Sequence, residues 1–323
     1  MKNVEILMLS PMMPLVMDGI AKNFTLHRAW EKPDLDGYVR EVASGIRGLA
    51  PGSHAKIDGD LFDKLPNLEI VANMGVGYDT IDAKEAGRRG IVVTNTPDVL
   101  TEEVADLAVG LLLATVRHLP QVDRHLRAGQ WLKVPYPLTP TLRGRRIGIL
   151  GLGRIGRAIG RRLEGFGVEI AYHGRHKQEA VPYRYEPTLI DLATNSDVLL
   201  CVAPGGTVTN GMVDAEVLKA LGPDGILINV GRGSVVDEPA LIEALRSKTI
   251  LSAGLDVFAD EPRVPAELIG MDHVVLLPHV GSASVETRRA MGQLVVDNLV
   301  SWFSGKGPVT PVAETPYRGV AVA

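Results

Sequence analysis

The sequence has few of the features that mark secreted, membrane-bound or thiolate-metal proteins. It contains one cysteine, Cys201, among 323 residues, which excludes a disulfide framework or a thiolate cluster and fits a reducing compartment. Its longest apolar runs, such as residues 107–116, fall short of the roughly 18 residues that cross a bilayer. Residues 1–5 predict the start of a strand rather than a secretory signal. We therefore expect a cytoplasmic protein without membrane association, in which the lone cysteine is a small buried side chain.

Neither sign of charge dominates the sequence. It has 34 lysine and arginine residues against 38 aspartate and glutamate residues, so it lacks the basic excess typical of nucleic-acid-binding proteins. With 46% hydrophobic and 22% charged residues, the chain has the composition of a folded protein, which excludes disorder as its main state. Its length suggests about two domains.

Short apolar runs alternate with helix-like segments along the chain, which predicts parallel sheets covered by helices. In the first hundred residues, strands are expected at 4–9, 46–50, 68–73 and 91–94. From residue 146 a second alternation predicts six strands, at 147–150, 168–172, 198–202, 225–230, 251–255 and 274–277. Their continuous apolar character is typical of strands covered on both faces, and six of them make a doubly wound sheet.

Two longer helices are also predicted. Residues 104–119 are apolar almost all round, so this helix must be buried on more than one side. It lies at the centre of the monomer or also faces a second subunit, and the sequence leaves both alternatives open. Residues 285–303 predict a final helix that carries the chain back to the first domain. An extended tail over 305–323, rich in proline and glycine, follows it.

The strongest single motif is G-x-G-x-x-G at residues 151–156, which follows the strand 146–150 and opens a helix. In this strand–turn–helix context, the glycines predict a dinucleotide site rather than a purely structural turn. Gly151 allows the tight turn, Gly153 lets the backbone approach a pyrophosphate, and Gly156 lets the helix pack on its strand. The helix N-terminus then offers free N–H groups to the phosphates.

The choice of cofactor depends on the end of the next strand. NAD sites usually carry an acid there, about 20 residues on, that binds the ribose 2′-hydroxyl. Residues 172–177 read YHGRHK and contain no acid. Arg175 and Lys177 could pair with a 2′-phosphate, which predicts NADP(H), with NAD(H) as the alternative cofactor and a solvated basic turn as the structural alternative. The expected cofactor contacts are Gly151, Gly153, Arg154, Ile155, Gly156, Gly174, Arg175, His176, Lys177, Ala203, Val230, Asp256 and Gly281.

Three ionisable residues, Arg232, Glu261 and His279, each follow the C-terminal end of a predicted strand. In an open α/β sheet this edge is where ligands bind. Arg232 would bind the carboxylate and carbonyl oxygen of a 2-keto acid, and His279 would donate a proton to that oxygen. Glu261 would hydrogen-bond the imidazole and stabilise its charged form. Taken singly, each has a structural alternative: a surface arginine, a helix-start acid or a loop histidine. No set of metal ligands is expected.

Together these motifs resemble those of the D-isomer-specific 2-hydroxyacid dehydrogenases. The resemblance extends over nearly the whole chain and rests on residues 75–79, 151–156, 229–233, 254–262 and 277–281. It implies an α/β fold of two Rossmann-like domains with doubly wound parallel sheets. A dinucleotide-binding domain, residues 100–284, would be inserted into a flavodoxin-like substrate-binding domain, residues 1–99 and 285–323, with the active-site cleft between them.

The resemblance also implies roles for particular residues. The arginine, glutamate and histidine just named would form the catalytic set. The backbone amides of Val76 and Gly77 would bind the substrate carboxylate, and Asp256 would lie near the nicotinamide. The family further implies a homodimer built through the cofactor domain, which favours an interface role for the apolar helix 104–119.

Within the family, the missing acid and the Gly174-Arg175 pair are similar to those of the NADPH-preferring glyoxylate/hydroxypyruvate and hydroxyphenylpyruvate reductases. The leading hypothesis is therefore NADPH-dependent reduction of glyoxylate or hydroxypyruvate to the D-2-hydroxy acid, with no nucleic-acid partner. An aromatic 2-keto acid reductase is an alternative, which pocket width near residues 48–53, Met74 and Trp131 would decide. A dinucleotide-sensing corepressor, acting by binding alone, is an alternative from another class.

Overall fold

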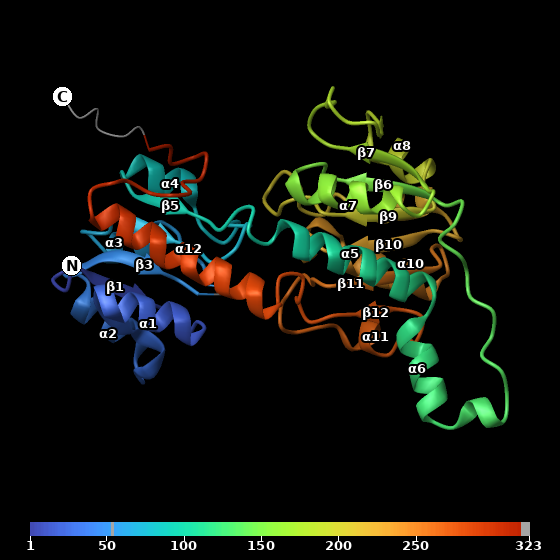
Figure 1. Cartoon of the computed structure of the whole chain (residues 1–323), viewed down its shortest axis with the longest axis horizontal. Helices are drawn as coiled ribbons and strands as arrows, with labels where there is room; N and C mark the ends of the chain where they lie inside the picture. Colours follow the sequence, from blue (N-terminus) through green and yellow to red (C-terminus); the bar gives the residue numbers. More distant parts are fainter. Residues whose placement is uncertain (53–54, 318–323) are drawn as a thin grey trace. The chain divides into compact units, whose positions relative to one another are not determined.

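The computed structural model describes residues 1–52 and 55–317. The chain forms two compact units, one of residues 1–100 with those from 284 onward and one of residues 101–283, and each has its own parallel sheet (Figure 1). Ser53, in the stretch expected to set the pocket width, and the end of the tail, 318–323, lie outside the described residues. Among the residues that are described, no helix has both the length and the apolar character needed to cross a membrane.

The described residues of the first unit form a five-stranded parallel sheet in the order β2-β1-β3-β4-β5. Its strands are β1 (Glu5–Met8), β2 (Thr25–Arg28), β3 (Ile46–Ala50), β4 (Ile70–Ala72) and β5 (Val92–Thr94). This order is flavodoxin-like and confirms the predicted fold class. The sequence does not predict β2, because this edge strand is largely polar and none of its residues is fully buried.

Helices cover both faces of this sheet. They are α1 (Pro14–Asn23), α2 (Leu35–Val42), α3 (Gly59–Lys64), α4 (Ala83–Arg88) and α12 (Val285–Phe303), with the 3-10 turn η1 (Ala29–Glu31). α1 and α12 contribute Val16 and Leu299 to the core on one face, and α3 contributes Phe62 to the core on the other. After α12 the tail runs along the sheet edge, where the Val312 amide donates to the Val93 carbonyl oxygen at 2.9 Å.

The second unit is built on a seven-stranded parallel sheet in the order β12-β11-β10-β9-β6-β7-β8. Its strands are β6 (Arg146–Leu150), β7 (Glu169–His173), β8 (Arg184–Tyr185), β9 (Val198–Cys201), β10 (Ile226–Asn229), β11 (Ser252–Leu255) and β12 (Val275–Leu276). Six strands match predicted positions. The sequence does not predict the seventh strand, β8, because a two-residue, partly exposed edge strand leaves no apolar run in the sequence. Since β7 and β8 lie on one side of β6 and β9 to β12 on the other, the sheet is doubly wound.

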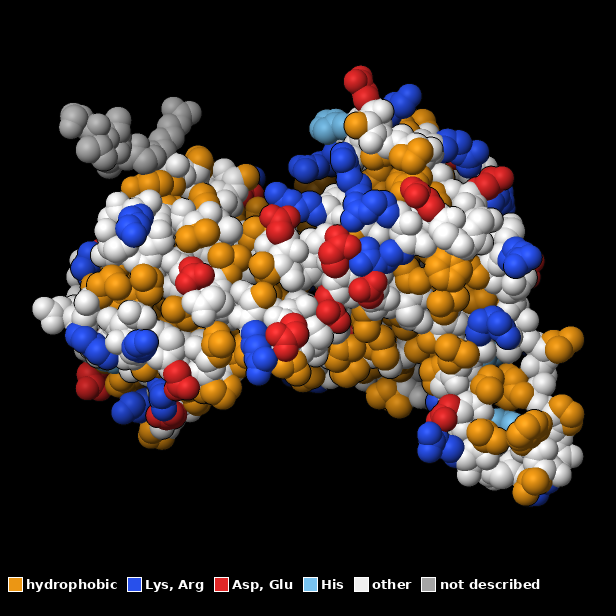
Figure 2. All heavy atoms as spheres, viewed as in Figure 1, with side chains coloured by type: hydrophobic (Ala, Val, Ile, Leu, Met, Phe, Trp, Pro, Cys, Tyr) orange, Lys and Arg blue, Asp and Glu red, His pale blue; other side chains and the backbone are white. Residues whose placement is uncertain are grey.

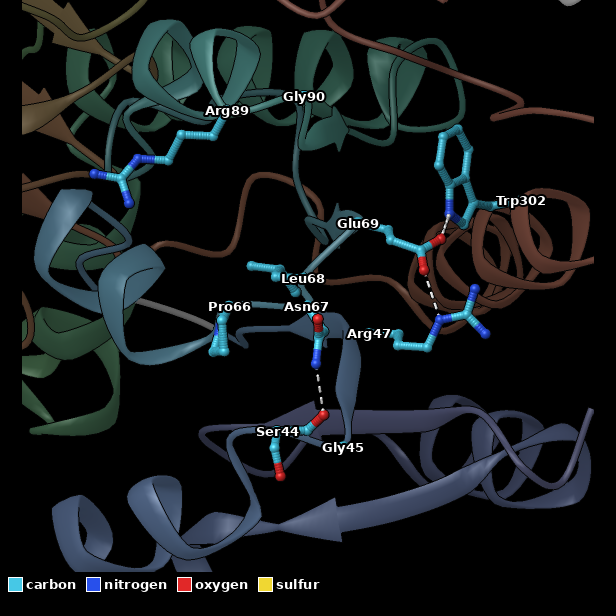
Figure 3. Close-up of a pocket in the computed structure, with 10 residues that line it drawn as sticks. All are labelled: Ser44, Gly45, Arg47, Pro66, Asn67, Leu68, Glu69, Arg89, Gly90 and Trp302. Carbon is cyan, nitrogen blue, oxygen red and sulfur yellow. Dashed lines mark hydrogen bonds and ion pairs between the residues drawn. The ribbon is translucent and has the colours of Figure 1, made fainter.

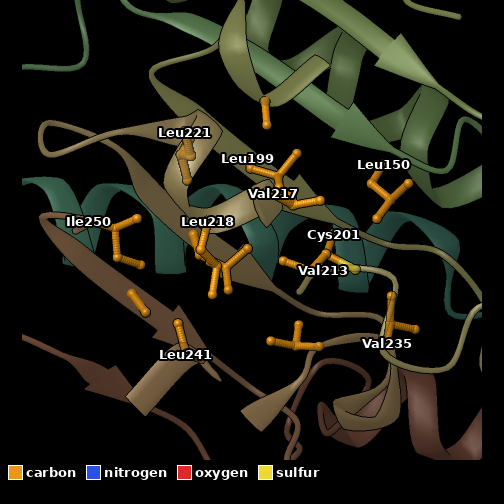
Figure 4. Packing of buried hydrophobic residues seen from close by; sticks show 14 of the residues in the cluster. Leu150, Leu199, Cys201, Val213, Val217, Leu218, Leu221, Val235, Leu241 and Ile250 are labelled. Carbon is orange, nitrogen blue, oxygen red and sulfur yellow. The ribbon is translucent and has the colours of Figure 1, made fainter. Parts of the chain in front are cut away.

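The helices of this unit enclose a continuous apolar core, part of which Figure 4 shows between the sheet and α9. They are α5 (Thr101–Val116), α6 (Leu119–Arg127), α7 (Arg154–Glu164), α8 (Leu189–Thr194), α9 (Ala215–Leu221), α10 (Glu238–Arg246) and α11 (Ala266–Ile269), with the 3-10 turns η2 (Gln130–Leu132) and η3 (Gly233–Val235). Cys201 lies in this core beside Leu199 and Leu218, as predicted. Burial raises the pKa of its thiol to about 12, so it is not a reactive thiolate.

The predicted apolar helix 104–119 is in fact two helices. α5 ends at Val116, His118 has left-handed backbone with a φ of 53°, and α6 begins one residue later. Pro120 in the first turn of α6 explains the break, because proline cannot continue the hydrogen bonds of a preceding helix. α5 is buried inside its own unit, whereas α6 and η2 extend away from the sheet (Figure 1). The burial of α5 therefore needs no second subunit.

Candidate active site

The glycine loop lies at the C-terminal end of β6, beside the point between β6 and β9 where the strand order reverses. Gly151 has a φ of 97°, and a Cβ there would lie 3.0 Å from the Ala203 backbone, so glycine is required. A Cβ at Gly156 would lie 2.2 Å from the Gly151 carbonyl oxygen, so α7 packs tightly on the loop. Gly153, which caps α7, has open space where a Cβ would lie. The loop therefore fits a pyrophosphate group, because its backbone is held and its helix end is open.

Other predicted cofactor residues lie at the same edge of the sheet. Arg154 and Ile155 form the start of α7, directly beyond the glycine loop. Ala203 and Val230 follow β9 and β10, and the Val230 amide donates to the Cys201 carbonyl oxygen at 3.0 Å, which joins these two strand ends. The structure thus brings these residues together around the loop.

The basic turn, residues 174–177, follows β7 and is exposed at its cationic positions. Figure 2 shows lysine and arginine side chains gathered over α7 and β7. Arg175 and Lys177 form no ion pair with any residue that the structure describes. Their charges are therefore available to an anionic ligand.

Glu261 and His279 are hydrogen-bonded to each other beyond β11 and β12. Glu261 Oε2 lies 2.6 Å from His279 Nδ1, and Glu261 Oε1 accepts a hydrogen bond from the Phe258 amide at 3.0 Å. The glutamate side chain is 15% exposed and the histidine side chain 42% exposed. Because the carboxylate accepts the Nδ1 proton, it stabilises a charged ring and leaves Nε2 as the nitrogen that can meet a substrate.

Asp256 holds the backbone that presents His279. Its side chain is buried, and its two oxygens accept hydrogen bonds from the amides of Val280 (2.7 Å) and Gly281 (2.8 Å). The His279 amide donates to the Asp256 carbonyl oxygen at 2.9 Å. These bonds support His279 in left-handed backbone, with a φ of 53°, which a residue with a Cβ adopts only when its surroundings impose it. Burial raises the pKa of the Asp256 carboxyl group.

Arg232 is held by the turn after β10. The buried side chain of Asn229 donates from Nδ2 to the Arg232 carbonyl oxygen at 3.0 Å and accepts from the Gly231 amide at 3.1 Å. A Cβ at Gly233 would lie 1.9 Å from the Phe258 carbonyl carbon, so this turn packs directly on the segment that leads to the glutamate. The three predicted catalytic residues therefore stand on strand-end loops that support one another.

In the first unit, the loop after β4 has its peptide planes fixed by hydrogen bonds to its carbonyl oxygens. The Thr96 amide donates to the Gly75 oxygen and Asn95 Nδ2 donates to the Val76 oxygen, both at 2.9 Å. In a trans peptide the N–H points away from the preceding C=O. The amides of Val76 and Gly77 are therefore turned away from these donors, and neither donates a hydrogen bond to another described residue. This is the arrangement that binding of a carboxylate requires.

These features can be compared with those of known proteins. The family model "D-isomer specific 2-hydroxyacid dehydrogenase, NAD binding domain" matches residues 109–281, a range that holds the glycine loop and all three predicted catalytic residues. The chain belongs to this family. It is therefore an oxidoreductase of the NAD(P)-dependent 2-hydroxyacid dehydrogenases, which confirms the resemblance seen in the sequence.

Relatives match along nearly the whole of this family member. Glyoxylate/hydroxypyruvate reductase A of Arabidopsis thaliana is 47% identical, and the match covers 97% of this chain and 100% of the relative. Hydroxyphenylpyruvate reductase of Plectranthus scutellarioides is 45% identical with the same coverage. Among solved structures, an NADPH-dependent glyoxylate/hydroxypyruvate reductase of Sinorhizobium meliloti, in complex with NADP and malonate, is 50% identical with a TM-score of 0.92, covering 99% of this chain and 100% of that chain.

A separate hollow of about 430 Å³ opens at the other end of the first unit's sheet (Figure 3). There Glu69 lies between Arg47 Nε, at 2.5 Å, and Trp302 Nε1, at 3.0 Å. Both surrounding strands, β3 and β4, begin here, so the hollow lies at the edge opposite the 75–77 loop. Because it lies at the opposite edge of the sheet from that loop, it does not belong to the candidate site.

Sequence reasoning missed the residues that support the site. Asn229 had a signal, because an amide directly before a Val-Gly-Arg-Gly turn can hydrogen-bond the turn's backbone. Asp256 was expected only as a neighbour of the nicotinamide, and its bonds to two amides in a loop 24 and 25 residues further on leave no local signal. Among the described residues there is no group of three or more His, Cys, Asp or Glu side chains that could hold a metal ion.

Proposed function

We propose that this enzyme uses NADPH to reduce small 2-keto acids, glyoxylate and hydroxypyruvate first, to the D-2-hydroxy acid. The observation that carries the proposal is the Glu261–His279 pair, held at 2.6 Å on the same sheet edge as the glycine loop. The relatives named glyoxylate/hydroxypyruvate reductase support this substrate class.

In this proposal His279 is the general acid. When bound, the reduced nicotinamide supplies the hydride for the keto carbon. His279 Nε2 donates a proton to the carbonyl oxygen as electrons reach it, and general acids of this kind contribute roughly 10²- to 10⁴-fold. The ring is left neutral and hydrogen-bonded to Glu261 until solvent returns a proton to it. The same groups run the reverse reaction, with the neutral ring as the base.

Two sets of donors would hold the substrate. The Arg232 guanidinium offers paired N–H groups that suit the carboxylate and the carbonyl oxygen of a 2-keto acid. The amides of Val76 and Gly77 would bind the carboxylate, because their peptide planes are already oriented and need no reordering on binding. We therefore propose Val76 and Gly77 in the first unit, and Arg232 and His279 in the second, as substrate-binding residues, and we assign cofactor binding to the second unit.

The cofactor proposal is NADP(H) in preference to NAD(H). Residues 174–177 after β7 contain no acid, and Arg175 and Lys177 are exposed and form no ion pair with a described residue, which favours a ligand that carries a 2′-phosphate. Arg154 and the open position at Gly153 would lie along the pyrophosphate. Gly174, His176, Ala203, Val230 and Gly281 remain proposed neighbours of the cofactor, and Asp256 a proposed neighbour of the nicotinamide that also supports the histidine turn.

We also propose that the enzyme is a homodimer through its second unit. Large hydrophobic side chains are exposed along α6 and the segment that follows it, with Leu132 94% exposed and Leu138 102% exposed. Figure 2 shows them gathered on this extension. Monomeric proteins seldom leave so contiguous an apolar surface in water, and a second copy would bury it. The other members are Leu119, Leu126, Trp131 and Val134.

The function is tested by steady-state kinetics of the purified protein with glyoxylate, hydroxypyruvate and phenylpyruvate, each with NADPH and with NADH. The proposal predicts the highest kcat/KM for glyoxylate or hydroxypyruvate with NADPH. A preference for phenylpyruvate would favour the second candidate, an aromatic 2-keto acid reductase, which the hydroxyphenylpyruvate reductase relative supports. Cofactor binding without turnover of any keto acid would refute the reductase proposal and favour a dinucleotide-sensing protein.

A further inference from the structure

The backbone of the basic turn must be held in place if its cations are to recognise a 2′-phosphate. Residues 174–177 leave the sheet after β7, and the side chains of Arg175, His176 and Lys177 are exposed. A loop that is ordered only when ligand binds loses affinity to that ordering, so a selective 2′-phosphate site needs its cations on a supported backbone. Among the described residues, the Tyr185 hydroxyl donates to the Gly174 carbonyl oxygen at 3.4 Å, and a second side chain, that of Gln178, supports the other end of the turn.

Gln178, directly after the turn, joins three elements. Its side-chain Nε2 donates to the Leu152 carbonyl oxygen, inside the glycine loop, at 2.8 Å. Its Oε1 accepts from Arg157 on α7, with distances of 3.0 Å from Nε and 2.5 Å from Nη2. Its backbone amide donates to the buried Tyr172 hydroxyl on β7 at 2.6 Å. One half-buried residue therefore connects the turn to the strand before it, to the pyrophosphate loop and to the helix.

The charge of this arrangement matters as much as its geometry. Arg157 is held by a neutral amide oxygen and forms no ion pair with a carboxylate among the described residues. Its positive charge is therefore not cancelled. A glutamate at position 178 could accept from Arg157 equally well, but it would add a negative charge beside the turn and could not donate to Leu152.

We propose that Gln178 is a positioning residue for NADP(H) selectivity, which ties the basic turn to the glycine loop and holds Arg157 beside it with its charge intact. This inference rests on the proposed cofactor preference. It assigns to Gln178 no contact with substrate and no part in proton transfer. It predicts that changes at this residue alter the contribution of the 2′-phosphate and leave the rest of cofactor binding unchanged.

The test compares two nucleotides that differ only in the 2′-phosphate, adenosine 2′,5′-bisphosphate and adenosine 5′-monophosphate, by titration calorimetry. Gln178→Met keeps the length of the side chain and removes its hydrogen bonds. We expect about tenfold weaker binding of the bisphosphate, the effect of losing one or two net hydrogen bonds, with binding of the monophosphate changed less than about twofold. Gln178→Glu should weaken the bisphosphate further, because it adds repulsion. Gln293→Met, on the exposed surface of α12, is the matched control and should change neither.

Equal weakening of both nucleotides by Gln178→Met would overturn the proposal, because it would show only general support of the loop. Unchanged binding of both would overturn it as well. If the wild-type protein binds the two nucleotides equally, the cofactor preference and this inference both fail. If the wild type prefers the bisphosphate and Gln178→Met keeps that preference, only this inference fails. In steady-state kinetics the same variant should raise KM for NADPH while KM for NADH and kcat stay near wild type.

Discussion

Replacement of Glu261 by glutamine probes the proton donor without changing the size of any side chain. The carboxylate accepts hydrogen bonds from His279 Nδ1 at 2.6 Å and from the Phe258 amide at 3.0 Å. Glutamine offers one oxygen and one NH₂ group. If the glutamine oxygen keeps the bond to the Phe258 amide, the glutamine NH₂ group faces His279 Nδ1. The doubly protonated ring then has a hydrogen-bond donor opposite its Nδ1–H, in place of the carboxylate acceptor.

The size of the effect follows from this exchange. A hydrogen bond to a charged group contributes about 1.5–3 kcal/mol. Because the His279 side chain is 42% exposed, solvent screening favours the lower end of that range. A loss of about 1.5 kcal/mol in the transition state lowers kcat/KM for keto acid reduction about tenfold. The reduction needs a proton on the ring, and the variant holds the protonated ring less well, so the loss should appear in kcat/KM while NADPH binding stays unchanged.

The assay is kcat/KM for glyoxylate with saturating NADPH, measured beside the dissociation constant of NADPH. The matched control is Glu238→Gln, because Glu238 also accepts from a backbone amide of this loop, that of Ala259 at 3.1 Å, and glutamine can keep that bond. The control should retain the wild-type kcat/KM. If Glu261→Gln also retained it, the carboxylate would have no part in holding the acid and the mechanism would be wrong.

Three further predictions address the cofactor, the sheet and the assembly. Arg175→Ala should raise KM for NADPH far more than KM for NADH in steady-state kinetics, and equal increases would remove the 2′-phosphate role. The Arg146 guanidinium lowers the pKa of Asp197 below its ordinary 3.8, so the ion pair stabilises the fold above that pH and the contribution is lost as pH falls through the lowered pKa. Asp197→Asn should therefore reduce the free energy of unfolding in urea by about 0.5–1 kcal/mol at pH 7. This difference between the variant and the wild type should shrink toward pH 3. A difference that grew toward pH 3 would refute the reasoning. Leu132→Asp should convert a dimer to monomers in sedimentation velocity, and a monomeric wild type would remove the dimer proposal.

The parts of the fold that the sequence predicts are those whose signal is local and apolar. Most of the central strands are continuous hydrophobic runs, and the glycine loop combines a strand, a turn and a helix start within a few residues. The edge strands β2 and β8 lack such a signal, because each is short and half exposed. The break between α5 and α6 does have a sequence signal, Pro120, but the continuous apolar run around it favours a single helix.

The candidate site divides in the same way. Arg232, Glu261 and His279 are predictable because each follows a strand in one motif. The groups that support them are not, since a residue such as Asp256 acts through hydrogen bonds to another loop that only the folded chain brings near. Gln178 is a similar case, because its partners lie on the glycine loop and on α7. Sequence patterns therefore identify the reacting groups, and the structure identifies what holds them.

The most direct test of the central claim is NADPH oxidation with glyoxylate by the wild type and by His279→Ala, measured together with NADPH binding by fluorescence titration. We expect the wild type to turn over and the variant to lose roughly 10²- to 10⁴-fold in kcat, with the dissociation constant of NADPH unchanged, because general acid catalysis has that size. A variant that keeps the wild-type kcat, or that loses NADPH binding along with activity, would contradict the assignment of His279 as the proton donor.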